Sequence, residues 1–396
     1  MAYAARRNSS SVACCAIAIR CGTRYEEGFH SGTAHFAEHA LFRGTSLKSA
    51  RVIGSFLDRL GGDLNAYTTK EEIVIHATVL KEDVRKAASL LMELASMATF
   101  PEDGIITERG VVLDEIISYK DSPADDVYDR FEEEIFDGHP LGTPILGTSA
   151  SVRKITSREL KRFYSKYFRP ERMAFSVVAD IDEKKMEAMI RSLSGKYFAG
   201  GSFPSGQLSG IPADGKLFDR TVEKRNHEVN AVIGAVGPSL YDDGRYAAAL
   251  LANILGGPAS NSVLGSILRE RNGWVYGVEC TYTQYTDTGL FAISFGCDRP
   301  NLDRCLSVVE RETAKMASTP LSPRRLAAAK KQLLGQMAIA SESGEARSQA
   351  MAKSLLAYGR VAPPEETRSR LEAVTPDDLM WMAQRLFKAP SRLIYL

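Results

Sequence analysis

Apolar and polar residues follow one another along this chain in a pattern that occurs twice. Residues 11–19 and 229–236 are apolar runs of strand length, which predict strands buried on both faces. A charged turn follows each run. Helical periodicity then begins at Thr33 in the first half and covers residues 246–255 in the second. The pattern therefore predicts a strand, a turn and a helix near the start of each half.

The repeat continues through the rest of both halves. Residues 65–91 and 282–309 each predict two extended segments, a charged turn and an amphipathic helix. Each half then closes with a helix, for which Thr156 and Thr375 are the expected N-caps, and a final strand. These elements predict an α+β fold of two homologous α/β-roll-like units, each an antiparallel sheet covered by helices.

A linker separates the two halves. Residues 196–217 are rich in Gly, Ser and Pro and interrupt the periodic pattern. The chain has 396 residues, of which 44% are hydrophobic, and this is enough apolar material for two cores. We expect an N-terminal domain at residues 1–205 and a homologous C-terminal domain at residues 206–396.

Composition excludes several classes of partner. Fifty basic and 49 acidic residues leave a formal charge of +1, which predicts no nucleic-acid-binding surface. The six cysteines lack metal-type spacing and lie mostly in apolar runs, as is typical of buried, reduced thiols. No apolar stretch reaches the roughly 18 residues of a membrane-spanning helix. We therefore expect a cytoplasmic protein that binds neither nucleic acid nor membrane.

The predicted helix that begins at Thr33 carries a group of residues typical of a metal site. His35 and His39 are four residues apart, so they share a helical face on which both imidazoles can bind one Zn²⁺. Glu38 completes the inverted order His-x-x-Glu-His and is the expected general base. The aligned residues 251–255 of the second half contain neither histidine nor glutamate. We expect one zinc ion per chain, bound by the first half.

The histidines could instead be solvated or cap the helix. An apolar helix would then bury polar groups without compensation, which is costly. Metal binding is therefore the favoured interpretation.

A catalytic zinc ion usually has three protein ligands and an open position for water. The helical stretch 107–119 offers Glu108 and Glu115, which are seven residues apart and share a face. The corresponding residues 322–336 of the second half contain no acidic side chain. The corresponding positions of the second half thus lack both the histidines and the carboxylates, and we expect a carboxylate as the third ligand.

Four segments in this order resemble the pitrilysin family, which includes insulin-degrading enzyme and mitochondrial processing peptidase: GTAHFAEHALFRGT, GGDLNAYTTKEE, ERGVVLDEI and HPLGTPILG. The resemblance covers nearly the whole chain. It implies that Glu115 is the third zinc ligand and that Glu108 supports the site. It also implies that Asn65 and Ala66 lie on an edge strand to which a substrate peptide adds as a further strand.

The second half resembles the family at a pair of substrate-contacting residues. Arg269 precedes Tyr276 by seven residues in LRERNGWVY, which is the family's spacing for this pair. NILGG also matches the family, but the NSVL that follows departs from the serine, arginine and leucine pattern usual there. A surface arginine and an unrelated sheet tyrosine are the alternative for this pair.

The resemblance implies a zinc-dependent endopeptidase or oligopeptidase. Glu38 would act as the base, and Tyr276 with Arg269 would stabilise the oxyanion. Family members close a chamber with four such units and this chain has two, so we expect a homodimer in which the partner's Arg269 and Tyr276 serve each zinc. A heterodimer with a homologous subunit is the less favoured assembly. Two other functions stay open: a non-catalytic peptide-binding or assembly subunit, and a peptidase that removes targeting peptides.

Overall fold

The computed structural model of the chain describes residues 1–198, 215–224 and 227–396. The chain divides into two compact units, and each unit combines segments from both halves of the sequence. The two units are made from the described residues within these ranges: 1–117, 143–207 and 338–362 for unit 1, and 118–142, 208–337 and 363–396 for unit 2.

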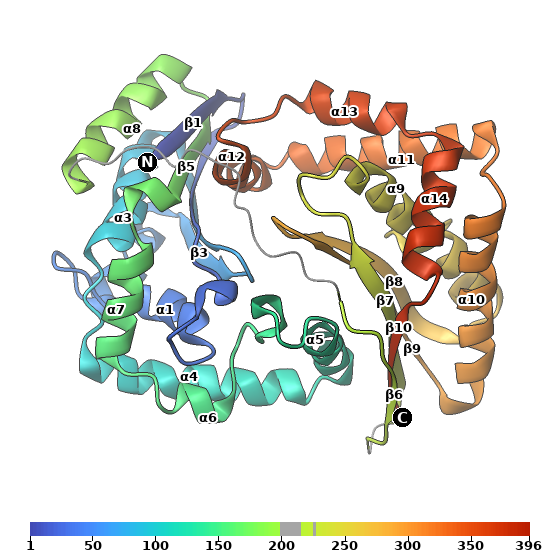
Figure 1. Ribbon diagram of the computed structural model, residues 1–396. Helices are drawn as coiled ribbons and strands as arrows, with labels where there is room; N and C mark the ends of the chain where they lie inside the picture. The colour runs from blue at the N-terminus through green and yellow to red at the C-terminus, as the bar shows by residue number, and fades with distance from the viewer. Residues whose placement is uncertain (199–214, 225–226) are drawn as a thin grey trace. The chain divides into compact units, whose positions relative to one another are not determined.

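Unit 1 contains a five-stranded sheet in the order β1-β5-β2-β4-β3 (Figure 1). The neighbouring strands are antiparallel except for β1 and β5, which are parallel. Its strands are Ala2–Arg7 (β1), Val12–Ile19 (β2), Asp63–Thr68 (β3), Ile73–Leu80 (β4) and Met173–Ala179 (β5). The central strand β2 is apolar along its whole length because both faces of the sheet are covered.

Helices cover both faces of the first sheet. On one face α3 packs against β2 and β4 while α8 packs against β1, and on the other face α12 crosses the central strands. Small side chains such as Ala16, Ala18 and Ala174 let α12 approach closely. The helices of unit 1 are Thr33–Leu41 (α1), Ala50–Gly54 (α2), Val84–Met97 (α3), Glu102–Lys120 (α4), Ser149–Val152 (α6), Ser157–Tyr167 (α7), Glu183–Tyr197 (α8) and Gly344–Tyr358 (α12). The last residues of α4 belong to unit 2.

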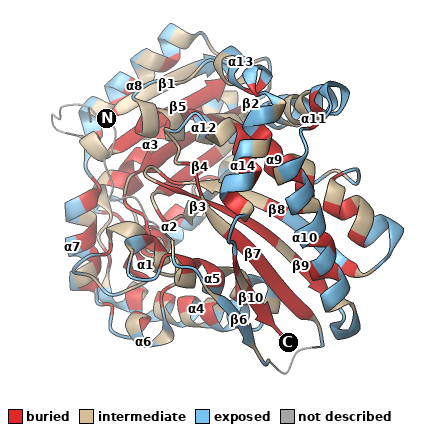
Figure 2. Ribbon diagram, turned by 45° about the vertical axis from the view of Figure 1, so that its right-hand side comes forward, coloured by how far each residue is buried: buried red, intermediate tan, exposed pale blue. Residues whose placement is uncertain are grey.

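Unit 2 repeats this arrangement with the strand order β6-β10-β7-β9-β8. Its strands are Asp219–Val222 (β6), Val229–Gly237 (β7), Val275–Gln284 (β8), Gly289–Cys297 (β9) and Ser391–Tyr395 (β10). One face packs against α9, α10 and α14, and the other packs against α5. The helices are Pro123–Ile135 (α5), Arg245–Gly256 (α9), Leu302–Ser318 (α10), Pro323–Ser341 (α11), Pro364–Ala373 (α13) and Pro376–Phe387 (α14). The central strands of both sheets are largely buried (Figure 2).

The two halves of the sequence exchange one helix each. Helix α5 comes from the first half and covers the second sheet, whereas α12 comes from the second half and covers the first sheet. The exchange means that neither half of the sequence supplies a complete unit. The predicted domain boundary at residues 205 and 206 lies outside the described residues, and the linear division into domains 1–205 and 206–396 stays a prediction.

The predicted α+β class is confirmed, since each unit is a mixed sheet with helices on both faces. Thr156 and Thr375 cap α7 and α14, as expected, by accepting hydrogen bonds from the backbone of Glu159 and Asp378. The strand predicted at residues 11–19 is β2, and a further strand that was not predicted, β1, precedes it and pairs with β5 at the sheet edge. No helix in the described part of the chain is both long and apolar enough to cross a bilayer.

Candidate metal centre

Helix α1 begins without a side-chain cap of its own. Its N-cap is Gly32, whose φ of 90° is a left-handed conformation that glycine adopts at low cost. The carboxylate of Glu26 instead accepts hydrogen bonds from the backbone nitrogens of Gly32 at 3.0 Å and Ala34 at 2.7 Å. Burial raises the pKa of Glu26 to about 8, against the opposing effect of these two N–H groups. A buried glutamate from outside the helix therefore holds its first turn.

Three predicted ligands meet in unit 1. His35 and His39 lie on one face of α1, with ring centroids 4.6 Å apart. Glu115 Oε2, from α4, lies 3.5 Å from His35 Nε2 and 3.4 Å from His39 Nε2. One potential ligand atom from each of the three residues lies within 4.8 Å of the other two. The structure thus brings together the residues that the sequence grouped.

These three residues fit a zinc ion. Metal–ligand bonds of about 2.1 Å at tetrahedral angles place neighbouring ligand atoms about 3.4 Å apart, and both nitrogen–oxygen distances agree with that value. Burial, together with the neighbouring His39, lowers the pKa of His35 to about 3. His35 is therefore neutral at physiological pH, which is the form that binds a metal.

Glu108 and Arg43 orient His39. Glu108 Oε1 lies 2.9 Å from His39 Nδ1, and the other carboxylate oxygen is bound by Arg43. Burial lowers the pKa of His39, but the bond to Glu108 and the nearby carboxylates outweigh it and raise the pKa. Burial likewise raises the pKa of Glu108, but His39 and Arg43 more than reverse this. An ionised Glu108 that accepts from Nδ1 leaves Nε2 free to bind a metal.

The proposed general base, Glu38, is buried on the same helix. Its Oε2 accepts a hydrogen bond from Thr68 Oγ1 at 3.2 Å, from the end of β3. Burial raises the pKa of Glu38, and the hydrogen bond from Thr68 partly opposes this. A carboxylate with a raised pKa is suited to take up and release a proton near neutral pH.

Asn65 and Ala66 lie on β3, which is the edge strand of the first sheet. Among the residues that the structure describes, β3 pairs with β4 alone. The amide nitrogen of Ala66 donates to Asn65 Oδ1 at 3.0 Å. That N–H is thus paired locally with a side chain.

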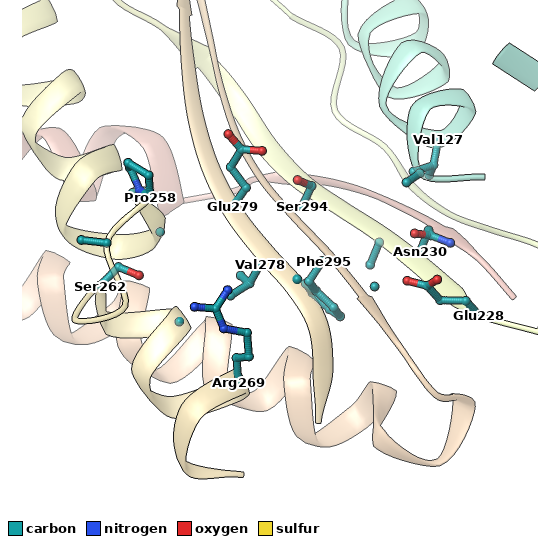
Figure 3. Close-up of a pocket in the computed structure, with 18 residues that line it drawn as sticks. Val127, Glu228, Asn230, Pro258, Ser262, Arg269, Val278, Glu279, Ser294 and Phe295 are labelled. Carbon is teal, nitrogen blue, oxygen red and sulfur yellow. The ribbon is translucent and has the colours of Figure 1, made fainter. Parts of the chain in front are cut away.

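Arg269 and Tyr276 belong to unit 2, whereas the metal candidates belong to unit 1. Arg269 lies on a π-helical segment, Gly265–Arg271, and donates to Glu270 at 2.9 Å. Its side chain lines a pocket of about 500 Å³ beside β8 (Figure 3). Tyr276 is 66% exposed and donates to Asp298 at 2.7 Å, and this bond raises the pKa of the phenol. Their role toward substrate stays a prediction.

Sequence reasoning missed three residues around the site: Glu26, Arg43 and Thr68. Arg43 lies just beyond the end of α1 and contacts Glu108, so helical spacing from His39 does not identify it. Glu26 and Thr68 carry no spacing signal either, because they lie outside the helix that they contact and reach it only through the fold.

Comparisons with known proteins identify the family. The profile described as "Insulinase (Peptidase family M16)" matches residues 2–149, and the profile "Peptidase M16 inactive domain" matches residues 154–333. An uncharacterized zinc protease of Rickettsia felis is 30% identical over 370 residues, covering 93% of this chain and 88% of that protein. An uncharacterized zinc protease of Bacillus subtilis is 29% identical over 384 residues, covering 96% and 92%.

Solved structures share the fold. The Pseudomonas fluorescens structure titled as a peptidase M16 inactive domain has a TM-score of 0.89 at 19% identity and covers 99% of this chain and 94% of that one. A protease from Helicobacter pylori has a TM-score of 0.88 at 20% identity, covering 100% and 96%. Given this shared fold and the sequence matches across both halves, the chain belongs to peptidase family M16, the insulinase or pitrilysin family that its motifs resemble.

Proposed function

We propose that this protein is a zinc-dependent endopeptidase or oligopeptidase that holds one zinc ion per chain. The observation that carries the proposal is the convergence of His35, His39 and Glu115 beside the buried carboxylate of Glu38. Two metal-binding histidines and a general base on one helix, with a third ligand nearby, are the groups that a zinc-dependent peptidase uses. The names of the relatives, zinc proteases, support the same activity.

The residues of the site divide the work of hydrolysis. Zinc, when bound, supplies Lewis acidity that lowers the pKa of water and polarises the peptide carbonyl. Glu38 takes the proton from the attacking water and delivers it to the leaving amine, which its raised pKa favours. Glu108, held by Arg43, keeps His39 in the tautomer that presents Nε2 to the site.

The substrate is a peptide that adds to the free edge of β3 at Asn65 and Ala66. Strand addition uses backbone hydrogen bonds, so it recognises an extended conformation more than a sequence. The exposed edge and the locally paired amide of Ala66 support this mode. In the assembled protein, a clamshell chamber encloses this peptide.

A homodimer is the proposed assembly, in which the partner's Arg269 and Tyr276 stabilise the oxyanion at each zinc. The Tyr276 hydroxyl donates to Asp298, and in the dimer it would donate to the oxyanion instead. Mixing Glu38→Gln subunits with Arg269→Ala subunits tests this, because only mixed dimers would contain one complete site. Recovered activity after subunit exchange supports the shared site, and an inactive mixture counts against it. Identifying the subunits that copurify with the protein distinguishes a homodimer from a heterodimer. Cell fractionation tests the cytoplasmic location.

A non-catalytic peptide-binding or assembly subunit is the second candidate. The phrase "inactive domain" in one matching profile motivates it. That profile covers residues 154–333 and therefore contains none of the residues of the candidate metal centre. A processing peptidase that removes targeting peptides is the third candidate, and it requires a non-identical partner subunit.

Activity and metal content measured together test the proposal. Wild type is expected to contain one zinc per chain and to cleave a mixed library of quenched fluorescent peptides. Glu38→Gln is expected to keep its zinc and lose cleavage, since the ligands remain and the base is gone. A wild-type protein that neither binds zinc nor cleaves any peptide would favour the non-catalytic candidate.

A further inference from the structure

A side-chain hydrogen bond joins Glu38, the proposed general base, to β3, the strand on which we expect the substrate peptide to bind. Thr68, the last residue of β3, donates from Oγ1 to Glu38 Oε2 at 3.2 Å. The same strand contains Ala66 and Asn65 two and three positions earlier. Helix α1, which carries the base, and the edge strand are therefore joined at the site itself.

Hydrogen bonds hold the turn that follows Thr68 in place. Thr69 Oγ1 accepts hydrogen bonds from the backbone nitrogens of Glu71 at 3.2 Å and Glu72 at 3.0 Å. Lys70 is buried and donates to the carbonyl oxygen of Thr143 at 2.7 Å. These contacts fix the end of β3 and, with it, the hydroxyl that reaches Glu38.

We propose that Thr68 is the positioning residue for the general base of the peptidase, an inference that rests on the proposed function. Its hydroxyl fixes Oε2 of Glu38, so that Oε1 stays free to accept the proton of the attacking water. Thr68 keeps its own proton throughout and exchanges none with water or substrate. A peptide that adds to β3 is bound by the strand whose last side chain aligns the base.

A purely structural role for Thr68 is separable from this one. Threonine favours strands because it is β-branched, and valine has the same shape and the same preference. Thr68→Val therefore removes the hydroxyl alone, whereas Thr68→Ser keeps it. Thr78→Val is the matched control, since Thr78 lies on the neighbouring strand β4 and its hydroxyl contacts Cys14 Sγ at 3.6 Å.

Kinetics on zinc-loaded protein give the first readout. Thr68→Val is expected to lose about 10- to 100-fold in kcat with little change in KM or zinc content, because a base out of line slows the chemical step. Thr68→Ser and Thr78→Val should keep near wild-type kcat.

Crystal structures of the same variants give a readout that does not depend on activity. The Glu38 carboxylate should face residue 68 in wild type and Thr68→Ser and leave that position in Thr68→Val. An unmoved carboxylate together with an unchanged kcat in Thr68→Val would overturn the inference. A loss confined to KM would assign Thr68 to substrate binding and would overturn it as well. Absence of cleavage by wild type would overturn the proposed function, while the position of the carboxylate in the variant structures would still decide whether Thr68 orients Glu38.

Discussion

Replacing Glu108 with glutamine probes how His39 is oriented. The carboxylate accepts from His39 Nδ1 with one oxygen and from Arg43 with the other. An amide has one oxygen that accepts and one nitrogen that donates. Whichever way the new amide turns, its nitrogen faces a donor, either Arg43 or the N–H of His39. The variant therefore leaves the amide nitrogen at the buried position 108 without an acceptor, or forces His39 into the tautomer that protonates Nε2.

The hydrogen bond that is lost in Glu108→Gln gives the expected size of the loss in zinc affinity. A buried group that loses its hydrogen-bond partner costs about 1–3 kcal/mol. A loss of that size in the metal-bound state corresponds to roughly 10- to 100-fold weaker zinc binding, the range typical of residues that orient metal-binding histidines. The assay is competition for zinc against a fluorescent chelator of known affinity, with Asp114→Asn as the control. Asp114 is an exposed acidic residue on the same helix, α4.

A double variant sharpens the test. Adding Arg43→Met to Glu108→Gln removes the second donor, so the amide oxygen can turn to His39 without a clash. We expect the double variant to bind zinc more tightly than Glu108→Gln alone. Zinc affinity of Glu108→Gln within threefold of wild type would refute the reasoning, as would a double variant weaker than both single variants.

Three further predictions concern the pH dependence of stability, the stabilisation by zinc and the exchange of helices. Burial raises the pKa of Glu26 to about 8 from 4.5, so its contribution to the free energy of unfolding is complete below pH 4.5 and is lost as the pH rises through 8. Denaturation of metal-free protein should show a steeper fall in that free energy between about pH 5 and 8 for wild type than for Glu26→Gln, and equal falls would contradict the assignment. Chelation of zinc should lower the melting temperature of wild type and not of His35→Ala, because zinc at 1,000 times its Kd stabilises the native state by about 4 kcal/mol. Residues 1–205 expressed alone should bind a hydrophobic dye, because the sheet face that α12 covers is exposed, and a monomeric fragment without dye binding would contradict the exchange of helices.

Local strands and helices could be predicted from the sequence, but the exchange of α5 and α12 between the two halves could not. Strand β2 and helix α9 lie within one residue of their predicted bounds, and α1 begins at the predicted Thr33, because apolar periodicity follows burial. Helices α5 and α12 were not predicted, and nothing local in the sequence encodes which sheet each covers, so the exchange depends on tertiary packing. Strand β1 was missed because it is short and its last two residues are exposed arginines.

The residues of the candidate site likewise fall into those that local sequence spacing predicts and those that only the folded chain brings together. His35, Glu38 and His39 follow from helical spacing, which is a local property of the chain. Choosing Glu115 over Glu108 as the ligand needed the family resemblance, since both share a helical face. The contacts of Thr68 and Glu26 with α1 join segments brought together only by the folded chain, and no spacing rule reaches them.

Anomalous diffraction at the zinc absorption edge, from crystals of wild-type protein grown with zinc, locates the metal ion. We expect one strong peak per chain within about 2.2 Å of His35 Nε2, His39 Nε2 and a Glu115 oxygen. In Glu115→Gln the peak should disappear or fall sharply in occupancy. No peak between these three side chains, or a peak bound by other residues, would show that they do not form the zinc site of this protein.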